Sequence, residues 1–441
     1  GVLFRNGFAA APGCAPSRAG LLTGRHIWTL KEAGTHASYF PRKLAVYPEL
    51  LQKADYFVGL TGKGAGPCNF RDAGWPHNPA GAPFDLVKES PAQQGMSAHD
   101  YAANFGKFLE KRPKGTPFCF WYGCQEPHRT YKKGIGVASG KRLDKIVVPP
   151  YLPDTLEVRS DIADYLTEVE HFDQHLGRML DALEKSGELE NTIVVVTADN
   201  GMSFPGAKAT MKDFGWHVPL AVMGKGRFRG GRVSEDLVSF TDLAPTFLEA
   251  AGVARPAGML GRSMLGLLGS TKSGVIDPKW DAVYAGRERH SHARRDNLGY
   301  PTRAVRTREH LYIRNFKPDL WMAGDPPKFH DIDDGPTKQW MMDHREEKAV
   351  RPLFQAAFGK MPSEELYNVR QDAGCLRNIA YEQPQVAAEL RKRLEGELRR
   401  TGDSRVTGKG DVWDSYPRHS PMRPELGGFA EQGKYNPALQ K

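Results

Sequence analysis

The chain has 441 residues, of which 40% are hydrophobic and 26% are charged, a composition typical of a globular protein long enough to form two domains. It holds no apolar run near the ~20 residues that a membrane-spanning helix requires, so no transmembrane segment is predicted. Lys and Arg outnumber Asp and Glu by 61 to 52, a formal charge of +9 that favours a polyanionic partner, but no nucleic-acid-binding motif accompanies this charge and nucleic acid is not the expected partner.

Cys14 lies just before the first predicted helix. Pro16 and Ser17 stand where a helix would begin, ahead of an apolar stretch. The start of a helix offers free backbone N–H groups and a positive dipole end to an anion. An isolated Cys most often packs as a small hydrophobe, so the residues around Cys14 decide its interpretation.

Residues 14–25, Cys-Ala-Pro-Ser-Arg-Ala-Gly-Leu-Leu-Thr-Gly-Arg, resemble the signature of type I sulfatases, C-x-P-S-R-x-x-x-L-x-G, and fill each of its fixed positions. In that family a formylglycine-generating enzyme oxidises the Cys to formylglycine, whose hydrated aldehyde is the nucleophile. The resemblance implies that Cys14 is the nucleophile and, once converted, a metal ligand, and that Arg18 holds the sulfate. It also implies an α/β fold of the alkaline-phosphatase type, with a large, mostly parallel sheet between helices and a smaller C-terminal α+β domain containing an antiparallel sheet.

The first elements of the family's core are missing from this chain. Residues 1–9 resemble the strand that in sulfatases follows the first strand and first helix. The Asp-Asp pair that supplies two calcium ligands at the end of that first strand is absent, and the only adjacent pair, Asp333-Asp334, lies far downstream in a Gly/Pro-rich loop. We therefore expect the chain to be truncated at its N-terminus.

Lys63 follows a short predicted strand over residues 57–61, which comes after a helix predicted over 47–54. The order resembles the sulfatase segment in which Gly-Lys-x-His follows a strand and both basic side chains reach the sulfate. Lys63 matches the Lys, whereas Ala65 occupies the His position. The resemblance implies that Lys63 binds sulfate without that His.

His128 follows a second predicted strand. Residues 101–109 predict an amphipathic helix, and residues 117–122 are fully apolar, as in a buried parallel strand. The segment Gln125-Glu126-Pro127-His128-Arg129 resembles the x-x-Pro-His-Arg of heparan N-sulfatases, in which the His binds sulfate or protonates the leaving group. An imidazole suits general acid catalysis near neutral pH, so His128 is a catalytic candidate.

Asp199 and Asn200 follow the clearest buried strand, residues 192–198. Ligands of open α/β sheets bind at this edge, and an adjacent carboxylate and amide oxygen suit a hard cation such as Ca²⁺. An Asx turn is the alternative interpretation. The resemblance favours one calcium ion per chain, bound by Asp199, Asn200 and converted Cys14. Upstream, apolar residues from Ile162 to Leu183 recur at steps of three and four and predict a long amphipathic helix, with Arg159, Asp161 and Asp164 on its solvated face.

Lys208 and His217 are the remaining basic candidates of this region. The residues after Asn200 resemble the sulfatase continuation, which implies that Lys208 contacts the sulfate on the side away from the metal; Lys212 is a nearby competitor. His217 precedes another predicted strand and is a second-rank substrate-binding candidate.

A composition shift at residues 269–279 predicts a boundary between a catalytic domain, 1–275, and a C-terminal subdomain, 276–441. Alternating patterns predict strands over 282–286, 302–306 and 310–314, and a last helix is expected over about 385–400. In the loop after the first of these strands, Glu288, His290 and His292 are either sugar contacts or plain surface residues. The tail from Asp411 is expected to be irregular and packed on the surface.

The four cysteines other than Cys14 are interpreted as structural. Their even number permits disulfides without demonstrating them. They are Cys68, Cys119, Cys124 and Cys375.

The resemblance covers nearly all of the chain and is closest to the heparan N-sulfatase branch. It implies a sulfatase acting on sulfate esters or sulfamates of a glycan, glycosaminoglycan-like or algal, in a periplasmic, secreted or lysosomal-type location. A phosphate or phosphonate ester hydrolase of the same fold and a non-catalytic polyanion-binding homologue are the alternatives. The sugar, the sulfated position and the oligomeric state do not follow from the sequence.

Overall fold

The computed structural model describes residues 1–91 and 93–426. Its first sheet has the order β5-β6-β1-β7, and β1 runs parallel to β7 but antiparallel to β6, which is also antiparallel to β5. The strands are β1 (Val2–Phe8), β5 (Ile193–Thr197), β6 (His217–Gly224) and β7 (Arg232–Ser239).

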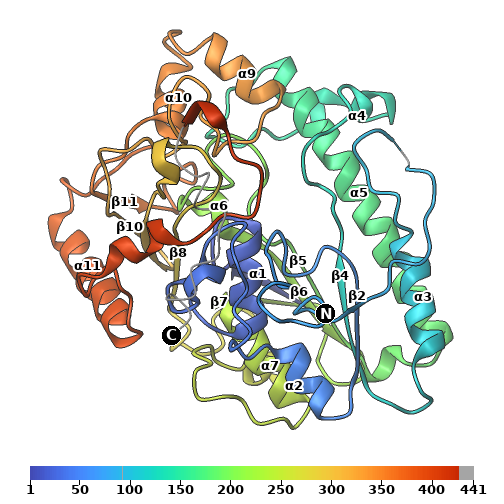
Figure 1. Ribbon diagram of the computed structural model, residues 1–441. Coiled ribbons are helices and arrows are strands. Elements are labelled where there is room, and N and C mark those ends of the chain that lie inside the picture. The colour runs from blue at the N-terminus through green and yellow to red at the C-terminus, as the bar shows by residue number, and fades with distance from the viewer. Residues whose placement is uncertain (92, 427–441) are drawn as a thin grey trace.

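A second sheet of three parallel strands lies beside the first, with the order β3-β2-β4. Its strands are β2 (Phe57–Gly62), β3 (Ala82–Pro83) and β4 (Phe118–Gly123). No hydrogen-bonded pairing joins β4 to β5 among the described residues, so each of these two strands is the end of its sheet. The large sheet expected from the sequence is therefore divided between them (Figure 1).

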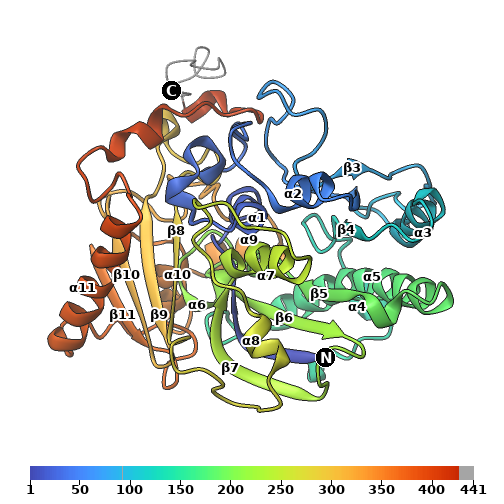
Figure 2. The same ribbon diagram turned by 90° about the horizontal axis from the view of Figure 1, so that it is seen from below.

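The longest helix, α5 (Leu156–Lys185), packs against α3 (Tyr101–Lys111) and α4 (Ile135–Ala138). Helices α5 and α3 each begin at a side-chain cap. Thr155 accepts a hydrogen bond from the amide of Val158, and Asp100 accepts one from the amide of Ala103. Helices α1 (Cys14–Thr23), α2 (Tyr47–Lys53) and α7 (Leu243–Ala250) contact one another and form a separate group from α3, α4 and α5 (Figures 1 and 2).

The expectation that Asp161 and Asp164 face solvent is wrong, because both are about 1% exposed. Asp161 binds the guanidinium of Arg129 and the amide and hydroxyl of Thr337. Asp164 accepts hydrogen bonds from the amides of Gly134 and Gly136. The polar side of α5 is thus covered by the segment after β4, by α4 and by the start of α9 (Pro336–Asp343), whose donors bind its carboxylates.

The C-terminal part forms an antiparallel sheet in the order β11-β10-β9-β8, as the sequence predicts. Helix α11 (Pro384–Arg400) packs on one face of this sheet (Figure 2). One cluster of buried apolar side chains includes Phe4, Leu237 and Leu311, so this sheet shares a core with the first one. The strands are β8 (Ala282–Arg287), β9 (Thr302–Thr307), β10 (His310–Asn315) and β11 (Glu364–Asn368).

The remaining elements are short. The α-helices are α6 (Asp213–Trp216), α8 (Leu265–Gly269), α9 (Pro336–Asp343) and α10 (Arg351–Phe358). Short 3₁₀ segments lie at Ile27–Thr29, Lys31–Gly34, Leu143–Lys145, Leu189–Asn191, Phe240–Asp242, Arg295–Asn297, Gly410–Ser415 and Pro424–Leu426. No helix in the described ranges is long and apolar enough to cross a membrane.

The predicted α/β fold with a separate antiparallel sheet is confirmed. The predicted boundary near residue 275 falls between α8 and β8 and stays a prediction. The five cysteines are all free thiols. The tail is irregular from Tyr416 to Arg423, and its last part, residues 427–441, lies outside the described residues.

Candidate active site

Cys14 is the first residue of α1 and is buried. The N-cap residue is Gly13, so no side chain caps the first backbone N–H groups of the helix. A Cβ at position 13 would lie 2.7 Å from Nδ1 of His290, which requires Gly there. The amides at the start of α1 are therefore available to an anion beside Cys14.

The rest of the signature holds α1 in the core. A Cβ on Gly20 would lie 2.4 Å from the Cβ of Ala10, at the end of the segment that enters the helix. Leu22 is fully buried, and Gly24 ends the helix in the left-handed region with φ of 61°. Leu22 and Gly24 occupy fixed positions of the signature, and together with Gly20, which stands at one of its variable positions, they fix the position of the helix start.

Arg18 lies one turn after Cys14 and joins three segments. Its Nη1 donates to the carbonyl oxygens of Gly64 and Gly66, at 3.1 and 3.2 Å. Its Nη2 lies 2.6 Å from Oδ2 of Asp199. The buried guanidinium thus links α1 to the loops that follow β2 and β5.

Lys63 and Lys208 bring two further positive charges to the same place. Burial, followed by the charge of Arg18, lowers the pKa of Lys63. Burial, the largest single effect, would lower the pKa of Lys208, but the charges of Asp333, Cys14 and Asp199 and the hydrogen bond to Asp333 together hold that pKa above its usual value. The charge of Lys208 also contributes to the lowered pKa of Lys63.

Asp199 and Asn200 follow β5, as predicted. Burial alone would raise the pKa of Asp199, but the charges of Arg18, Lys63 and Lys208 outweigh it, so the carboxylate is ionised. Asn200 Nδ2 donates to the carbonyl of Gly201 at 2.8 Å, whereas its buried Oδ1 has no partner among the described residues. An unpaired amide oxygen next to a carboxylate fits a hard cation, although Arg18 occupies one oxygen of Asp199.

His128 follows β4, and its side chain reaches solvent although neighbouring residues surround part of the ring. Its Nδ1 lies 2.6 Å from the carbonyl oxygen of Arg129, which favours the tautomer with hydrogen on Nδ1 and leaves Nε2 for a substrate. Partial burial, followed by the charges of Lys208 and Lys63, lowers the pKa of His128. Arg129 itself is held by Asp161 and by the carbonyl of Ser203, so the His128 segment is anchored.

His217 has both ring nitrogens in use. Its Nδ1 lies 2.8 Å from Oδ2 of Asp213, and its Nε2 lies 2.8 Å from the carbonyl oxygen of Arg5. Burial, the largest single effect, would lower the pKa of His217, but the hydrogen bond to Asp213, the charge of Asp213 and the hydrogen bond to the carbonyl of Arg5 together raise it above its usual value. The ring also stacks on Phe8, so its contacts tie β6 to β1 and leave no ring nitrogen for a substrate.

The three candidates of the loop after β8 have different environments. Glu288 is buried and its two oxygens bind Arg303 and Arg405, each at 2.7 Å. His292 is buried and accepts a hydrogen bond from the amide of Arg423. Only His290 lies beside Cys14, through its contact with Gly13.

Three residues missed at the sequence level also lie here. Asp333 has its Oδ2 2.6 Å from Nζ of Lys208. His36 is buried with its ring centroid 4.8 Å from that of His290, and Arg418 donates to the carbonyl of His290 at 3.1 Å. Asp333 belongs to the pair Asp333-Asp334, which was excluded as the calcium-binding pair because it lies far downstream in the chain. His36 and Arg418 belong to no motif that distinguishes them in the sequence.

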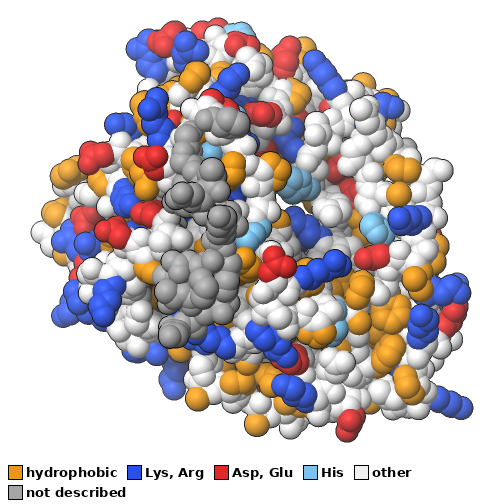
Figure 3. All heavy atoms as spheres, in the orientation of Figure 1, with side chains coloured by type: hydrophobic (Ala, Val, Ile, Leu, Met, Phe, Trp, Pro, Cys, Tyr) orange, Lys and Arg blue, Asp and Glu red, His pale blue; other side chains and the backbone are white. Residues whose placement is uncertain are grey.

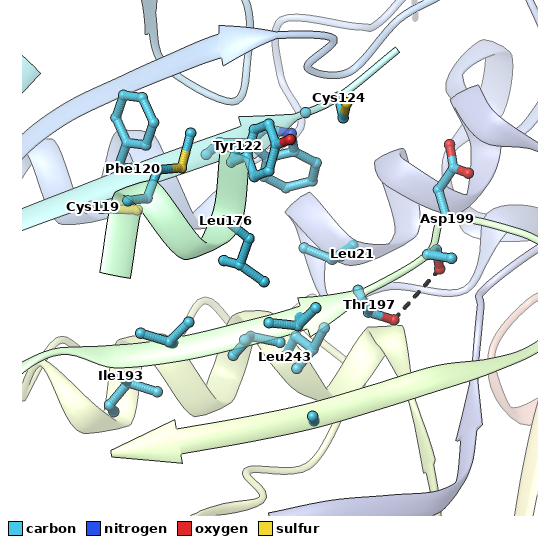
Figure 4. Close-up of a pocket in the computed structure, with 18 of the residues that line it drawn as sticks. Leu21, Cys119, Phe120, Tyr122, Cys124, Leu176, Ile193, Thr197, Asp199 and Leu243 are labelled. Atoms are coloured by element: carbon cyan, nitrogen blue, oxygen red, sulfur yellow. Dashed lines mark hydrogen bonds between the residues drawn. The ribbon is translucent and has the colours of Figure 1, made fainter. Parts of the chain in front are cut away.

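Cys14, Arg18, Lys63, Asp199 and Lys208 together form the Cys14 cluster. A cavity of about 880 Å³ extends from this cluster into the space between β4 and β5. Figure 4 shows Phe120 and Tyr122 of β4 across from Ile193 and Thr197 of β5, with Leu176 of α5 between them and Asp199 at one end. Cys14, Arg18, Lys63, His128 and Lys208 line the same cavity. On the face in Figure 3, Lys, Arg and His side chains gather in and around a hollow.

Two protein-family models match the chain. The model described as "Sulfatase" matches residues 1–253, and the model described as "N-sulphoglucosamine sulphohydrolase, C-terminal" matches residues 207–351. The human N-sulphoglucosamine sulphohydrolase is 29% identical over 349 residues, which are 71% of this chain and 66% of the relative. An ulvan-active sulfatase of Formosa agariphila is 26% identical over 434 residues, with 91% of this chain and 70% of the relative covered. The chain thus spans just under two thirds of the human protein.

Solved structures share the fold at lower identity. A protein solved in complex with its substrate D-glucosamine-2-N,6-O-disulfate has a TM-score of 0.63 at 20% identity, with 91% of both chains covered. A phosphonate monoester hydrolase from Silicibacter pomeroyi has a TM-score of 0.59 at 17% identity, with 92% of this chain and 90% of that chain covered. At these identities the likeness shows the fold alone, and one fold serves both sulfate and phosphonate chemistry.

Proposed function

Because this chain belongs to the sulfatase family, we propose that it hydrolyses sulfate esters or sulfamates of a glycan, with Cys14 converted to formylglycine as the nucleophile and one calcium ion as the cofactor. The observation that carries the proposal is the meeting of Cys14, Arg18, Lys63, Lys208 and Asp199 at one end of a cavity. A buried cysteine in a core would not gather three cations and an ionised carboxylate around itself.

Formylglycine, when present, supplies a hydrated aldehyde with one hydroxyl to attack sulfur and a second to release the sulfate. Cys14 stands at the uncapped start of α1, where backbone N–H groups can hold an oxygen of the substrate. His290 and His36 close one side of this position. The formylglycine-generating enzyme is accordingly a proposed partner.

Arg18, Lys63 and Lys208 would hold the negative charge of the sulfonyl oxygens. Preorganised charges of this kind usually supply the largest part of a rate enhancement. Arg18 is fixed by two carbonyl oxygens and a carboxylate, and Lys208 is fixed by Asp333. Their positions are therefore set before the substrate arrives.

Asp199 and Asn200 would hold the calcium ion, which supplies further positive charge at the sulfate. Their support is the ionised carboxylate of Asp199 and the unpaired Oδ1 of Asn200. His128 would protonate the leaving oxygen or nitrogen through Nε2, since Nδ1 is engaged by the carbonyl of Arg129.

The substrate class follows from charge and from the relatives. The formal charge of +9 and the basic hollow favour an anionic polymer. The names of the relatives point to N-sulphoglucosamine and to ulvan, so we propose a sulfated glycan of the glycosaminoglycan or algal type. We also propose a secreted, periplasmic or lysosomal-type location, where such polymers are degraded.

A phosphate or phosphonate monoester hydrolase is the second candidate, favoured by the fold shared with the Silicibacter pomeroyi enzyme. Aryl sulfate and aryl phosphate, assayed in parallel after co-expression with a formylglycine-generating enzyme, separate the two. We expect conversion of Cys14, seen as the corresponding mass loss in its tryptic peptide, together with faster release from the sulfate. An unconverted thiol in an active protein, or a preference for the phosphate, would overturn the proposal. A converted but inactive protein would instead favour a polyanion-binding homologue.

A further inference from the structure

Two buried histidines of α5, His171 and His175, have no part in the proposed chemistry. They stand one turn apart, so their side chains share one face of the helix. The ring centroids are 4.6 Å apart and the ring planes are nearly perpendicular, at 78°. His171 is 8% exposed and His175 is 3% exposed.

Glu89 brings a carboxylate to this pair from the loop that precedes α3. Its Oε1 lies 3.5 Å from Nε2 of His175. One potential ligand atom from each of Glu89, His171 and His175 lies within 4.8 Å of the other two. In addition, the buried Nε2 of His171 has no hydrogen-bond partner among the described residues. A buried imidazole nitrogen without a partner carries a free-energy cost that a bound cation would remove.

We propose that Glu89, His171 and His175 bind a zinc ion at a site distinct from the Cys14 cluster. Two imidazoles and a carboxylate with water as a fourth ligand suit Zn²⁺, whereas Ca²⁺ and Mg²⁺ prefer oxygen ligands alone. Zinc–ligand distances of ~2.0–2.1 Å place tetrahedral ligand atoms about 3.4 Å apart. The 3.5 Å between Glu89 and His175 already meets this spacing, and the half-exposed Glu89 can adjust to His171.

Asp100 lies near Nδ1 of His175, whereas the proposed ligand atom of this ring is Nε2. Its Oδ1 lies 3.6 Å from Nδ1 of His175, and its Oδ2 binds Arg178 at 2.7 Å. Imidazoles that bind a metal usually direct the other ring N–H at a carboxylate, which fixes the tautomer. The amide of Ala102 and Nη1 of Arg178 also approach this Nδ1, each at 3.4 Å, and zinc binding would favour the alternative in which Nδ1–H faces Asp100.

The ion would join Glu89, and with it the loop segments 85–91 and 93–99, to α5. In this loop the amide of Glu89 donates to the carbonyl of Ala98, and the amide of Ser97 donates to Oε1 of Glu126. Glu126 stands two residues before His128. The zinc site would thus stabilise the loop on which the His128 segment rests, while the ion itself takes no part in hydrolysis.

Zinc content of the full chain tests this site directly. The purified protein is stripped with a chelator, equilibrated with zinc chloride, desalted and measured by inductively coupled plasma mass spectrometry, with affinity from titration calorimetry. We expect about one zinc per chain in the wild type and loss of that zinc in Glu89→Gln and His171→Ala. Asp100→Asn keeps the α3 cap and should weaken zinc binding by about tenfold or more.

Two controls separate this site from other zinc binding. Asp199→Asn, in the Cys14 cluster, and His344→Gln, on the partly buried turn that follows α9, should both retain the zinc. A wild type without zinc, or a Glu89→Gln variant that binds as much zinc as the wild type, would overturn the proposal. Because Glu89 lies at the surface, this variant gives an answer even if His171→Ala does not fold.

Discussion

Asp333 and Lys208 form an ion pair, with Oδ2 and Nζ 2.6 Å apart, although 125 residues separate them in the chain. Lys208 is buried next to Cys14, whereas Asp333 comes from the loop between β10 and α9. The pair therefore connects the loop after β5 to the C-terminal part of the chain. It also keeps the Lys208 ammonium charged in a buried position.

Asp333→Asn should lower the free energy of unfolding by about 1–3 kcal/mol near neutral pH, because it leaves a buried cation without its partner. Lys208 and its hydrogen bond hold the pKa of Asp333 well below its usual range. The stabilisation is therefore fully present above the unfolded pKa of ~3.9 and is lost as pH falls below it. The difference in the free energy of unfolding between the variant and the wild type, measured by thermal unfolding, should be smaller at pH 3 than at pH 7. An equal difference at both values would contradict the prediction.

Arg18→Lys should lower kcat/KM for an aryl sulfate by about 10²–10³-fold. Lys keeps the charge, but its single ammonium cannot bind Gly64, Gly66 and Asp199 in the geometry of the guanidinium fork. Steady-state kinetics on the formylglycine-containing protein measure the change. Arg142→Lys, at an exposed ion pair with Asp144, is the matched control and should keep full activity.

His128 should produce an acid-side pH optimum. A proton donor must be protonated, and partial burial together with Lys208 and Lys63 holds the pKa of His128 below ~6.5. Activity on a glycan sulfate should therefore fall as pH rises through this pKa, and the fall should disappear in His128→Asn. The variant should lose about 10²–10⁴-fold on a glycan sulfate and much less on a nitrophenyl sulfate, whose leaving group needs no proton. Equal losses on both substrates would argue against an acid role.

Gly13→Ala should reduce both stability and activity. Its Cβ would lie 2.7 Å from the ring of His290, and overpacking of this kind costs about 1–3 kcal/mol. The double variant Gly13→Ala with His290→Ala should recover part of the lost stability, since the clashing ring is gone. A thermal-unfolding double-mutant cycle measures this coupling, and strictly additive effects would show that the two residues do not clash.

Calcium should stabilise the wild type but not Asp199→Asn. A ligand that binds only the native state adds about 2.7 kcal/mol at ~100 times its Kd. Thermal unfolding with calcium chloride and with a chelator measures the difference. A calcium-induced rise in Tm that persists in Asp199→Asn would show that the ion binds elsewhere.

The sequence predicted those parts of the site that follow strands or form a contiguous motif. Cys14 and Arg18 share one helix turn, and Lys63, His128 and Asp199 each follow a predicted strand, so their meeting follows from the order of the elements. Asp333 was missed because its position depends on how a distant loop folds back over Lys208. Asp161 was placed in solvent because helical periodicity does not reveal that Arg129 and Thr337 cover the polar side of α5.

The gap between β4 and β5 has a consequence for the backbone of both strands. Within the described residues, β4 pairs only with β2 and β5 pairs only with β6, and both border the cavity of about 880 Å³. On each strand, alternate amides point toward a neighbouring strand and toward the cavity. Deuterium exchange should therefore divide Phe118–Gly123 and Ile193–Thr197 into alternating slow and fast positions, with the fast amides marking the two edges that face each other.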